Sequence, residues 1–463
     1  MKGMKIKSFG LITLVLVFIG ILFLSMPASA KHYKHKKFPY NPIIFVHGGS
    51  GSGSQFESQA MRFTSNGYPQ DFIYVYEYDS TYTINTRDDI LAGLDERIAR
   101  VLVETGADQV DMLGHSHGTT IMHDYLGRPE GPERAEKIAH YVNIDGRSSD
   151  TPPGGVPTLA LWAEWRSTPG WIGGAENVTI PGTTHIEVAT CADSFSEMYR
   201  FFTEESPEIT MILPEPRGKI RLAGRAVFFP QNIGAPDATV KIYEVNGCTG
   251  TIMNKKPKAI YHLGEAGNWG PFKAKAGQHY EFVIVREGIN DHHFYYEPFI
   301  RSDYLIRLNT SPPDGIASYM DTSEYHSNMV VTRNKEFWGD QGIDNDILAV
   351  NGVNVVNTAI CPIAKRVSAI FVYDVDADGE SDLSQPTFYA NFPFLTGLDF
   401  YVSGADPPNG TTRLVLIGRG TGGAIRVINR PNWASSNDRV SVVFNDFAQG
   451  DSIPCCYEKP YRH

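Results

Sequence analysis

Short apolar runs alternate with amphipathic stretches between residues 42 and 204. Short runs that are apolar throughout are typical of strands buried on both faces of a parallel sheet. Between the second and third runs, apolar side chains recur at helical spacing, and Thr86-x-x-Asp89 and Gly106 are typical helix limits. Strands that alternate with helices predict an α/β fold. The predicted strands span residues 43–49, 72–78, 109–113, 141–146, 158–165 and 177–182.

After residue 207 helical periodicity gives way to alternating apolar and polar positions. These segments are rich in Val, Ile, Tyr and Phe, and turn sequences such as PPDG and PPNG separate them. The pattern predicts an all-β C-terminal region, built as an antiparallel sandwich or barrel. We expect an α/β domain over residues 38–207, a β-sandwich-like subdomain over 212–310, and a sandwich or barrel over 311–463.

The first thirty residues differ from the rest of the chain. Basic residues precede the apolar stretch 11–24, and the sequence ASA at 28–30 offers the small residues at which signal peptidase cuts. This order predicts a signal peptide over residues 1–30 and a protein that is secreted or held in the cell envelope. The alternative is an uncleaved membrane anchor.

Composition narrows the function classes. The chain is 42% hydrophobic and 20% charged, which is ordinary for a globular protein and argues against disorder. Its net charge of −11 argues against a nucleic-acid partner. The five cysteines fit no zinc pattern. In an exported protein we expect Cys455 and Cys456 to be oxidised, with partners that the sequence does not identify.

The motif Gly-His-Ser-His-Gly at residues 114–118 places Ser116 between an apolar strand and a segment that can start a helix. A strand–turn–helix with small residues on both sides is the setting that a G-x-S-x-G nucleophile needs. The helix N-terminus also favours negative charge that develops beside the serine. We therefore predict that Ser116 is a nucleophile; the alternative is a buried serine at an ordinary strand–helix turn.

The base is expected late in the same domain. The side chains of His115 and His117 flank the serine in a tight turn and point away from it, so neither can reach its hydroxyl. His185 follows the last predicted strand and precedes a closing helix, which makes it the predicted base. His117 is expected to act through its backbone N–H, as a donor to an oxyanion.

A second oxyanion donor is expected after the first strand. His47-Gly48-Gly49 forms a turn in which small residues let the backbone approach an acyl carbonyl, and Gly49 is the predicted donor. The competing interpretation is a phosphate-binding glycine loop, but the register of a G-x-G-x-x-G motif and a Walker lysine are both missing.

The acid must lie between the serine and the histidine in chain order. Asp145 ends one predicted strand and is followed by Gly146, which favours it. Glu164 ends the next strand and is the runner-up. Either residue could instead be a surface carboxylate.

The sequence around these candidate residues resembles the lipase and esterase branch of the α/β-hydrolase superfamily. It is most similar to two-domain prokaryotic lipases with a large C-terminal β domain. The resemblance rests on VHGGSGSGSQFESQAMRFTSNGYP, GHSHG, NIDG and THIEVAT, and covers residues 40–205. It implies Ser116 as nucleophile, Asp145 as acid, His185 as base, and the N–H groups of Gly49 and His117 as oxyanion hole. Catalysis would need no cofactor.

The chain departs from this family's pattern in two ways. Relatives often carry a bulkier apolar residue where this chain has Gly49, so the acyl pocket is expected to differ in shape. The segment 146–158 is too short for a large cap, so any lid would have to come from elsewhere, and residues 79–89 are one candidate segment.

A calcium loop is a further hypothesis, at residues 374–382. Carboxylates at alternate positions around a glycine suit a hard cation, and closely spaced carboxylates repel each other without one. The alternative is a solvated acidic turn. The expected ligands of a structural Ca²⁺ are Asp374, Asp376, Asp378, Glu380 and Asp382.

The function expected first is a secreted hydrolase of carboxylic esters, with lipids or other acyl esters as substrates. A polyester depolymerase whose β domain binds the polymer is an alternative, and in either case the β domain could contact a lipid surface or a polymer. A non-catalytic adhesion protein on a hydrolase scaffold is the alternative from another class.

Overall fold

The computed structural model describes residues 38–447. The predicted signal peptide and the pair Cys455 and Cys456 lie outside the described residues. Cys248 is disulfide-bonded, whereas Cys191 and Cys361 are free thiols. Within the described part of the chain, no helix is both long and apolar enough to cross a membrane.

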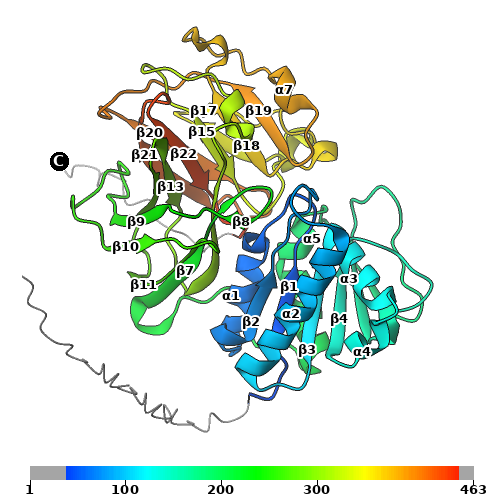
Figure 1. Ribbon diagram of the computed structural model, residues 1–463. Helices are drawn as coiled ribbons and strands as arrows, with labels where there is room; N and C mark the ends of the chain where they lie inside the picture. Colours follow the sequence, from blue (N-terminus) through cyan, green and yellow to red (C-terminus); the bar gives the residue numbers. More distant parts are fainter. Residues whose placement is uncertain (1–37, 448–463) are drawn as a thin grey trace, which may run out of the picture. The chain divides into compact units, whose positions relative to one another are not determined.

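A six-stranded sheet forms the first half of the fold, and all its pairings are parallel (Figure 1). Its strand order is β2-β1-β3-β4-β5-β6. The order in which strands are added to the sheet therefore reverses between β1 and β3. Open α/β sheets bind their ligands at such a switch point. All six predicted strands are present: β1 (Ile43–Val46), β2 (Ile73–Tyr76), β3 (Val110–His115), β4 (Ile138–Ile144), β5 (Thr158–Ala163) and β6 (Glu176–Ile180).

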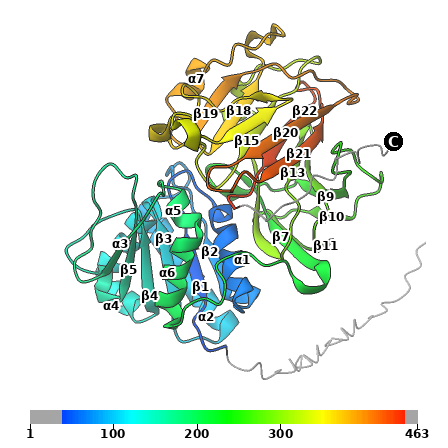
Figure 2. The same ribbon diagram turned by 180° about the vertical axis from the view of Figure 1, so that it is seen from behind.

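Helices cover both faces of this sheet, with α2 and α3 on one side (Figure 1) and α1 and α6 on the other (Figure 2). Side chains alternate along β1, so Ile44 and Val46 join the core under α2 and α3, while Phe45 stacks on Phe56 on the opposite side. The helices are α1 (Glu57–Ser65), α2 (Arg87–Thr105), α3 (His117–Gly127), α4 (Gly131–Ala135), α5 (Glu187–Thr190) and α6 (Ala192–Thr203).

The limits of α2 follow from its sequence. The side chains and backbone N–H groups of Thr86 and Asp89 bond reciprocally in a capping box, and Gly106 ends the helix in the left-handed conformation with φ = 68°. Ile90, Leu94 and the apolar residues in register with them are buried. This helix is formed as the sequence predicted.

The second half of the chain is almost entirely β structure, as predicted. Its elements are β7 (Lys219–Phe228), β8 (Ile233–Gly234), β9 (Thr239–Glu244), β10 (Ala259–His262), β11 (Asn268–Lys275), β12 (Tyr280–Arg286), β13 (Ile289–Tyr296), β14 (Asp303–Thr310), β15 (Met329–Thr332), β16 (Ile347–Val350), β17 (Val353–Asn354), β18 (Ala369–Tyr373), α7 (Thr387–Ala390), β19 (Leu395–Asp399), β20 (Thr411–Ile417), β21 (Ile425–Pro431) and β22 (Asp438–Val443).

The expectation of a wholly antiparallel region is wrong. The pairs β7–β14, β13–β22, β15–β22 and β18–β19 are parallel. Strands far apart in sequence meet there through long crossovers, which local alternation and turn signals cannot reveal.

Three sheets make up this region, and one of them crosses the predicted seam near residue 311. The eight-stranded sheet has the order β10-β9-β12-β13-β22-β15-β18-β19, so strands from both predicted β subdomains share it. The other two sheets have the orders β11-β7-β14 and β17-β16-β20-β21. Two hydrophobic clusters nevertheless remain distinct, one built from residues 220–308 and the other mostly from 329–444. The proposed boundaries stay predictions.

Candidate active site

Ser116 sits at a sharp turn between β3 and α3. Its backbone has φ = 53° and ψ = −118°, a combination that is costly for a residue with a side chain and is typical of functional sites. Its two flanking glycines are sterically required: a Cβ at Gly114 would lie 2.9 Å from the Gly118 carbonyl oxygen, and one at Gly118 would lie 2.3 Å from that of Val46. The turn therefore depends on both motif glycines, because strand and helix pass too close for any side chain.

The structure brings Ser116, His185 and Asp145 together at the carboxyl edge of the sheet. The hydroxyl oxygen of Ser116 lies 2.9 Å from Nε2 of His185, and Nδ1 of His185 lies 2.6 Å from a carboxylate oxygen of Asp145. Asp145 directly follows β4, and His185 lies between β6 and α5. Three predicted side chains from distant parts of the sequence thus form one hydrogen-bonded chain.

Asp145 is held as a carboxylate. Burial alone would raise its pKa, but the hydrogen bond and charge of His185, the Arg166 guanidinium and the Ala163 N–H together lower the pKa below its ordinary value. Nη1 of Arg166 lies 3.2 Å from the second carboxylate oxygen, and its guanidinium lies over the ring of Trp162. A carboxylate in this place can orient the imidazole and stabilise its charged form.

Glu164, the runner-up acid, binds a different group and not the imidazole of His185. Its carboxylate accepts a hydrogen bond of 2.6 Å from the Gly182 N–H, in the loop that leads to His185. The structure therefore brings Asp145 and not Glu164 to the imidazole.

His115 is buried behind the site and does not approach the serine hydroxyl. Burial lowers the pKa of His115 to about 3, so its ring is neutral at ordinary pH. Its Nε2 lies 2.8 Å from the His185 carbonyl oxygen and must donate, since a carbonyl only accepts. Nδ1 then accepts a hydrogen bond from the side-chain amide of Gln55. His115 therefore holds the backbone of His185.

The two predicted oxyanion donors lie on adjacent backbone segments beside Ser116. A Cβ at Gly49 would lie 3.8 Å from the Cβ of His117, and one at Gly48 would lie 3.0 Å from the Cβ of Ser116. His117 is the first residue of α3, where N–H groups have no partner inside the helix. Within residues 38–447 the Gly49 N–H has no hydrogen-bond acceptor either.

The segment suggested as a lid lies beside these donors. The Asp79 carboxylate accepts hydrogen bonds from the N–H groups of Thr81, Thr83 and Ile84 and so shapes the loop. The hydroxyl of Tyr82 lies 2.6 Å from Nε2 of His117. The side chain of the predicted oxyanion residue is therefore fixed by this loop.

The β region also contributes to the site. The ring of Phe394 is nearly parallel to the imidazole of His185, with 6.1 Å between ring centroids. Trp338 meets Trp165, which follows β5, edge to face. Glu336 accepts hydrogen bonds from the N–H groups of the two residues after His185. These residues and Arg166 carry no local motif, so sequence reasoning missed them.

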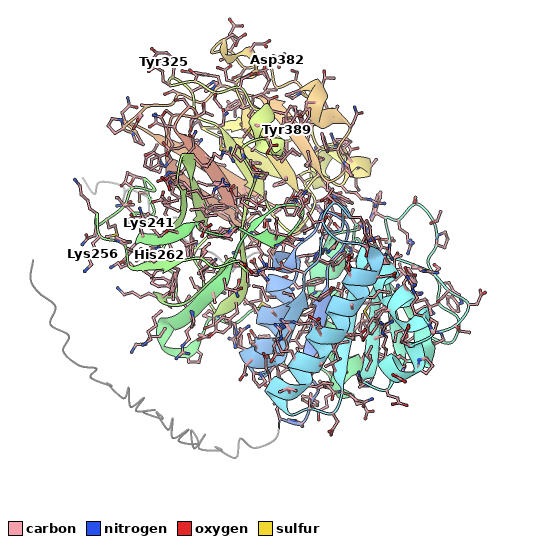
Figure 3. All side chains as sticks on the ribbon, viewed as in Figure 1. Lys241, Lys256, His262, Tyr325, Asp382 and Tyr389 are labelled. Atoms are coloured by element: carbon pink, nitrogen blue, oxygen red, sulfur yellow. The ribbon has the colours of Figure 1, made fainter. Side chains whose placement is uncertain are left out.

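The predicted calcium ligands do not converge. Among the described residues, no three Asp, Glu, His or Cys side chains form a group that could hold a metal ion. Asp374 is buried and paired with His326, whereas the other four are exposed, including Asp382 at the outer part of the region (Figure 3). Asp378 and Asp382 accept hydrogen bonds from backbone N–H groups two residues further on. Such turns account for these two carboxylates without a cation, and the calcium hypothesis gains no support.

Two lipase family models match the chain. The model described as class 2 lipase matches residues 40–143, and the model described as lipase C-terminal domain matches residues 218–313. A third model, described only as a C-terminal domain, matches residues 315–448.

Solved structures with distant similarity include a gene product of Listeria innocua, at 14% identity over 37% of this chain and 97% of that one, with a TM-score of 0.29. Lipase B of Aspergillus fumigatus matches at 14% identity over 40% and 57%, with a TM-score of 0.30. Phospholipase PlaB of Legionella pneumophila matches at 10% identity over 89% and 96%, with a TM-score of 0.23. TM-scores this low do not support an assignment of function, so the assignment rests on the two lipase models and the parallel sheet. The two lipase models and the parallel sheet support an α/β hydrolase of the lipase and esterase branch with a C-terminal β domain, and the class 2 lipase model supports ester hydrolysis.

Proposed function

We propose that this protein is an exported serine hydrolase that cleaves carboxylic esters of lipids through an acyl-enzyme intermediate. The observation that carries the proposal is the chain of contacts from Ser116 through His185 to Asp145, with 2.9 Å and 2.6 Å between the bonded atoms. A nucleophile, a base within hydrogen-bond reach and a group that orients the base are the three parts that acyl transfer needs.

In the first half of the reaction, the Ser116 oxygen attacks the ester carbonyl carbon while Nε2 of His185 takes the hydroxyl proton. The imidazolium that forms is stabilised by the Asp145 carboxylate, whose charge is maintained by its lowered pKa. The C–O bond then breaks, and His185 gives the proton to the leaving alcohol. Water repeats the sequence against the acyl-enzyme, which releases the acid and restores the serine.

The negative charge of each tetrahedral intermediate would be bound by the N–H groups of Gly49 and His117. Their segments lie next to each other beside Ser116, and the N-terminal end of α3 adds a favourable dipole. Removal of one such donor typically costs about 3 kcal/mol of transition-state stabilisation.

An apolar acyl group is favoured by the rings around the site. The ring of Phe394 lies nearly parallel to the imidazole of His185 at 6.1 Å between centroids, and Trp165, which is half exposed, contacts Trp338. Such surfaces contribute roughly 25 cal/mol for each Å² of apolar area that a ligand covers. Export rests on the predicted signal peptide alone.

A chain-length series tests the substrate class. We expect kcat/KM on p-nitrophenyl esters to rise with acyl length from acetate upward, and Ser116→Ala to abolish turnover of every ester. The same enzyme should release little soluble acid from a polyester film. Preferential attack on the film would favour a polyester depolymerase, and wild-type protein without activity on any ester would contradict the proposal.

A further inference from the structure

We propose that Glu336, a residue of the β region, is a positioning residue for the base His185. The inference rests on the proposed function, because it assigns His185 that role. Glu336 does not contact the imidazole. It would act through the backbone that carries this side chain.

The carboxylate of Glu336 binds the two residues that follow the base. Oε1 accepts a hydrogen bond of 2.6 Å from the Ile186 N–H, and Oε2 accepts one of 3.1 Å from the Glu187 N–H. Glu336 is completely buried, with 0% of its surface exposed. Hydrogen bonds to a charged acceptor are the stronger kind, and water does not compete for them in a buried place.

The same backbone is held from the other side by the hydrolase region. His115 donates from Nε2 to the carbonyl oxygen of His185, 2.8 Å away. The peptide group between His185 and Ile186 is therefore fixed at both ends, through its C=O by His115 and through its N–H by Glu336. The next peptide group is held through the Glu187 N–H. A fixed backbone sets the direction of the side chain, and Nε2 thereby stays within reach of Ser116.

Glu336 is itself held in place by charged neighbours. The side chains of Arg333 and Arg419 both donate to its carbonyl oxygen, and both guanidinium groups bind Asp346. The two arginines hold the pKa of Asp346 at about 2, in spite of the burial that would raise it. Arg419 also pairs with Glu187, so the β region holds the segment after His185 at two points.

A carboxylate is the side chain that fits this place. Both oxygens of Glu336 accept, and each faces one N–H. In Glu336→Gln one oxygen becomes an NH₂ group, which cannot accept and would face an N–H donor. The exchange keeps the size of the side chain, so a change in activity reports the lost hydrogen bond.

The experiment compares Glu336→Gln with Glu297→Gln. Glu297 is a matched control because it is also a buried glutamate of the β region that accepts a backbone hydrogen bond, 2.6 Å from the Asn445 nitrogen. For both variants we would measure kcat and KM on a soluble ester, the rate of fluorophosphonate labelling, and the low-field proton resonance of the His185 Nδ1–H bond to Asp145.

We expect Glu336→Gln to lower kcat and the labelling rate on the order of 10- to 100-fold, since a misplacement near 1 Å can cost this much. KM should change little, and the low-field resonance should shift or broaden. Glu297→Gln should keep kcat, the labelling rate and the resonance, even if it melts earlier.

Wild-type kcat in Glu336→Gln, or an equal loss per folded molecule in Glu297→Gln, would overturn the inference. If Glu336→Gln does not fold, hydrogen exchange of the wild-type Ile186 and Glu187 amides decides. Strong protection supports the role, and rapid exchange refutes it. A wild-type enzyme that hydrolyses no ester would instead refute the proposed function.

Discussion

The hydrolase region and the β region both bury ionisable side chains, but they surround them differently. Around Ser116, the groups lie at strand ends, on backbone with positive φ at Ser116 and Asp145, and the serine is only partly covered. In the β region, His293 is buried between the carboxylates of Glu281 and Asp438, inside the eight-stranded sheet.

The comparison indicates that the reacting groups combine strained backbone with access to solvent. The buried ion pairs of the β region instead have a structural role. Charged side chains that bind only each other rigidify a structure, but they leave no atom free for a substrate. The β region approaches the site through Glu336, which binds backbone, and Phe394, which offers a ring.

Replacement of the acid should have the largest effect. In Asp145→Asn the amide cannot hold His185 in the required tautomer or stabilise its charge, so we expect kcat to fall roughly 10⁴-fold. Steady-state kinetics on a soluble ester measure the loss. Glu164→Gln should stay close to wild type, and the reverse pattern would make Glu164 the acid.

The two strand-end acids show how far sequence reasoning goes. The alternation of strands and helices predicted the sheet, and with it that Ser116, Asp145 and His185 would lie at one edge. The choice between Asp145 and Glu164 stayed open because both end a strand. Only the hydrogen bonds of the folded chain separate them.

Other features were beyond the sequence for physical reasons. Glu336 stands 150 residues from the N–H of Ile186 that it binds, in a segment without regular periodicity. The parallel pair β13–β22 likewise joins distant segments. The acidic run at 374–382 suggested calcium ligands, but sequence spacing alone cannot distinguish such ligands from Asp side chains that bind nearby backbone N–H groups, as Asp378 and Asp382 do.

Steric crowding at the turn that carries Ser116 should produce the second largest effect, a loss of stability in Gly118→Ala. The added methyl group in Gly118→Ala would lie 2.3 Å from the Val46 carbonyl oxygen, so we expect a loss of about 3 kcal/mol in the free energy of unfolding. Gly127→Ala is the control in the same helix, since nothing lies within 4 Å of its added methyl group. That change should stabilise by up to about 1 kcal/mol. Urea unfolding of both variants checks the prediction, and equal effects would contradict it.

The two regions should respond to pH in opposite directions, with smaller effects. Burial would lower the pKa of His293, but its bonds to Asp438 and Glu281 outweigh this and raise it to about 9. Its contribution to stability is therefore complete below about pH 6.5, the ordinary value, and is lost as pH rises through 9. The slope is at most about 1.4 kcal/mol per pH unit.

His115 should act with the other sign. Its folded pKa of about 3 lies below the ordinary value, so its contribution is complete above about pH 6.5 and is lost as pH falls toward 3. The free energy of unfolding would be measured against pH for wild type, His293→Gln and His115→Gln. His293→Gln should lose only the slope above about pH 6.5, and His115→Gln only the slope below it. Unchanged slopes in the two variants would contradict both assignments.

The most direct test of the central claim is covalent trapping of the nucleophile. After treatment with a fluorophosphonate, peptide mass spectrometry should find the adduct on the peptide that contains Ser116, in parallel with the loss of esterase activity. Ser116→Ala should take up no label and hydrolyse no ester. An adduct on another residue that accompanies inactivation, or ester hydrolysis that persists in Ser116→Ala, would contradict the account.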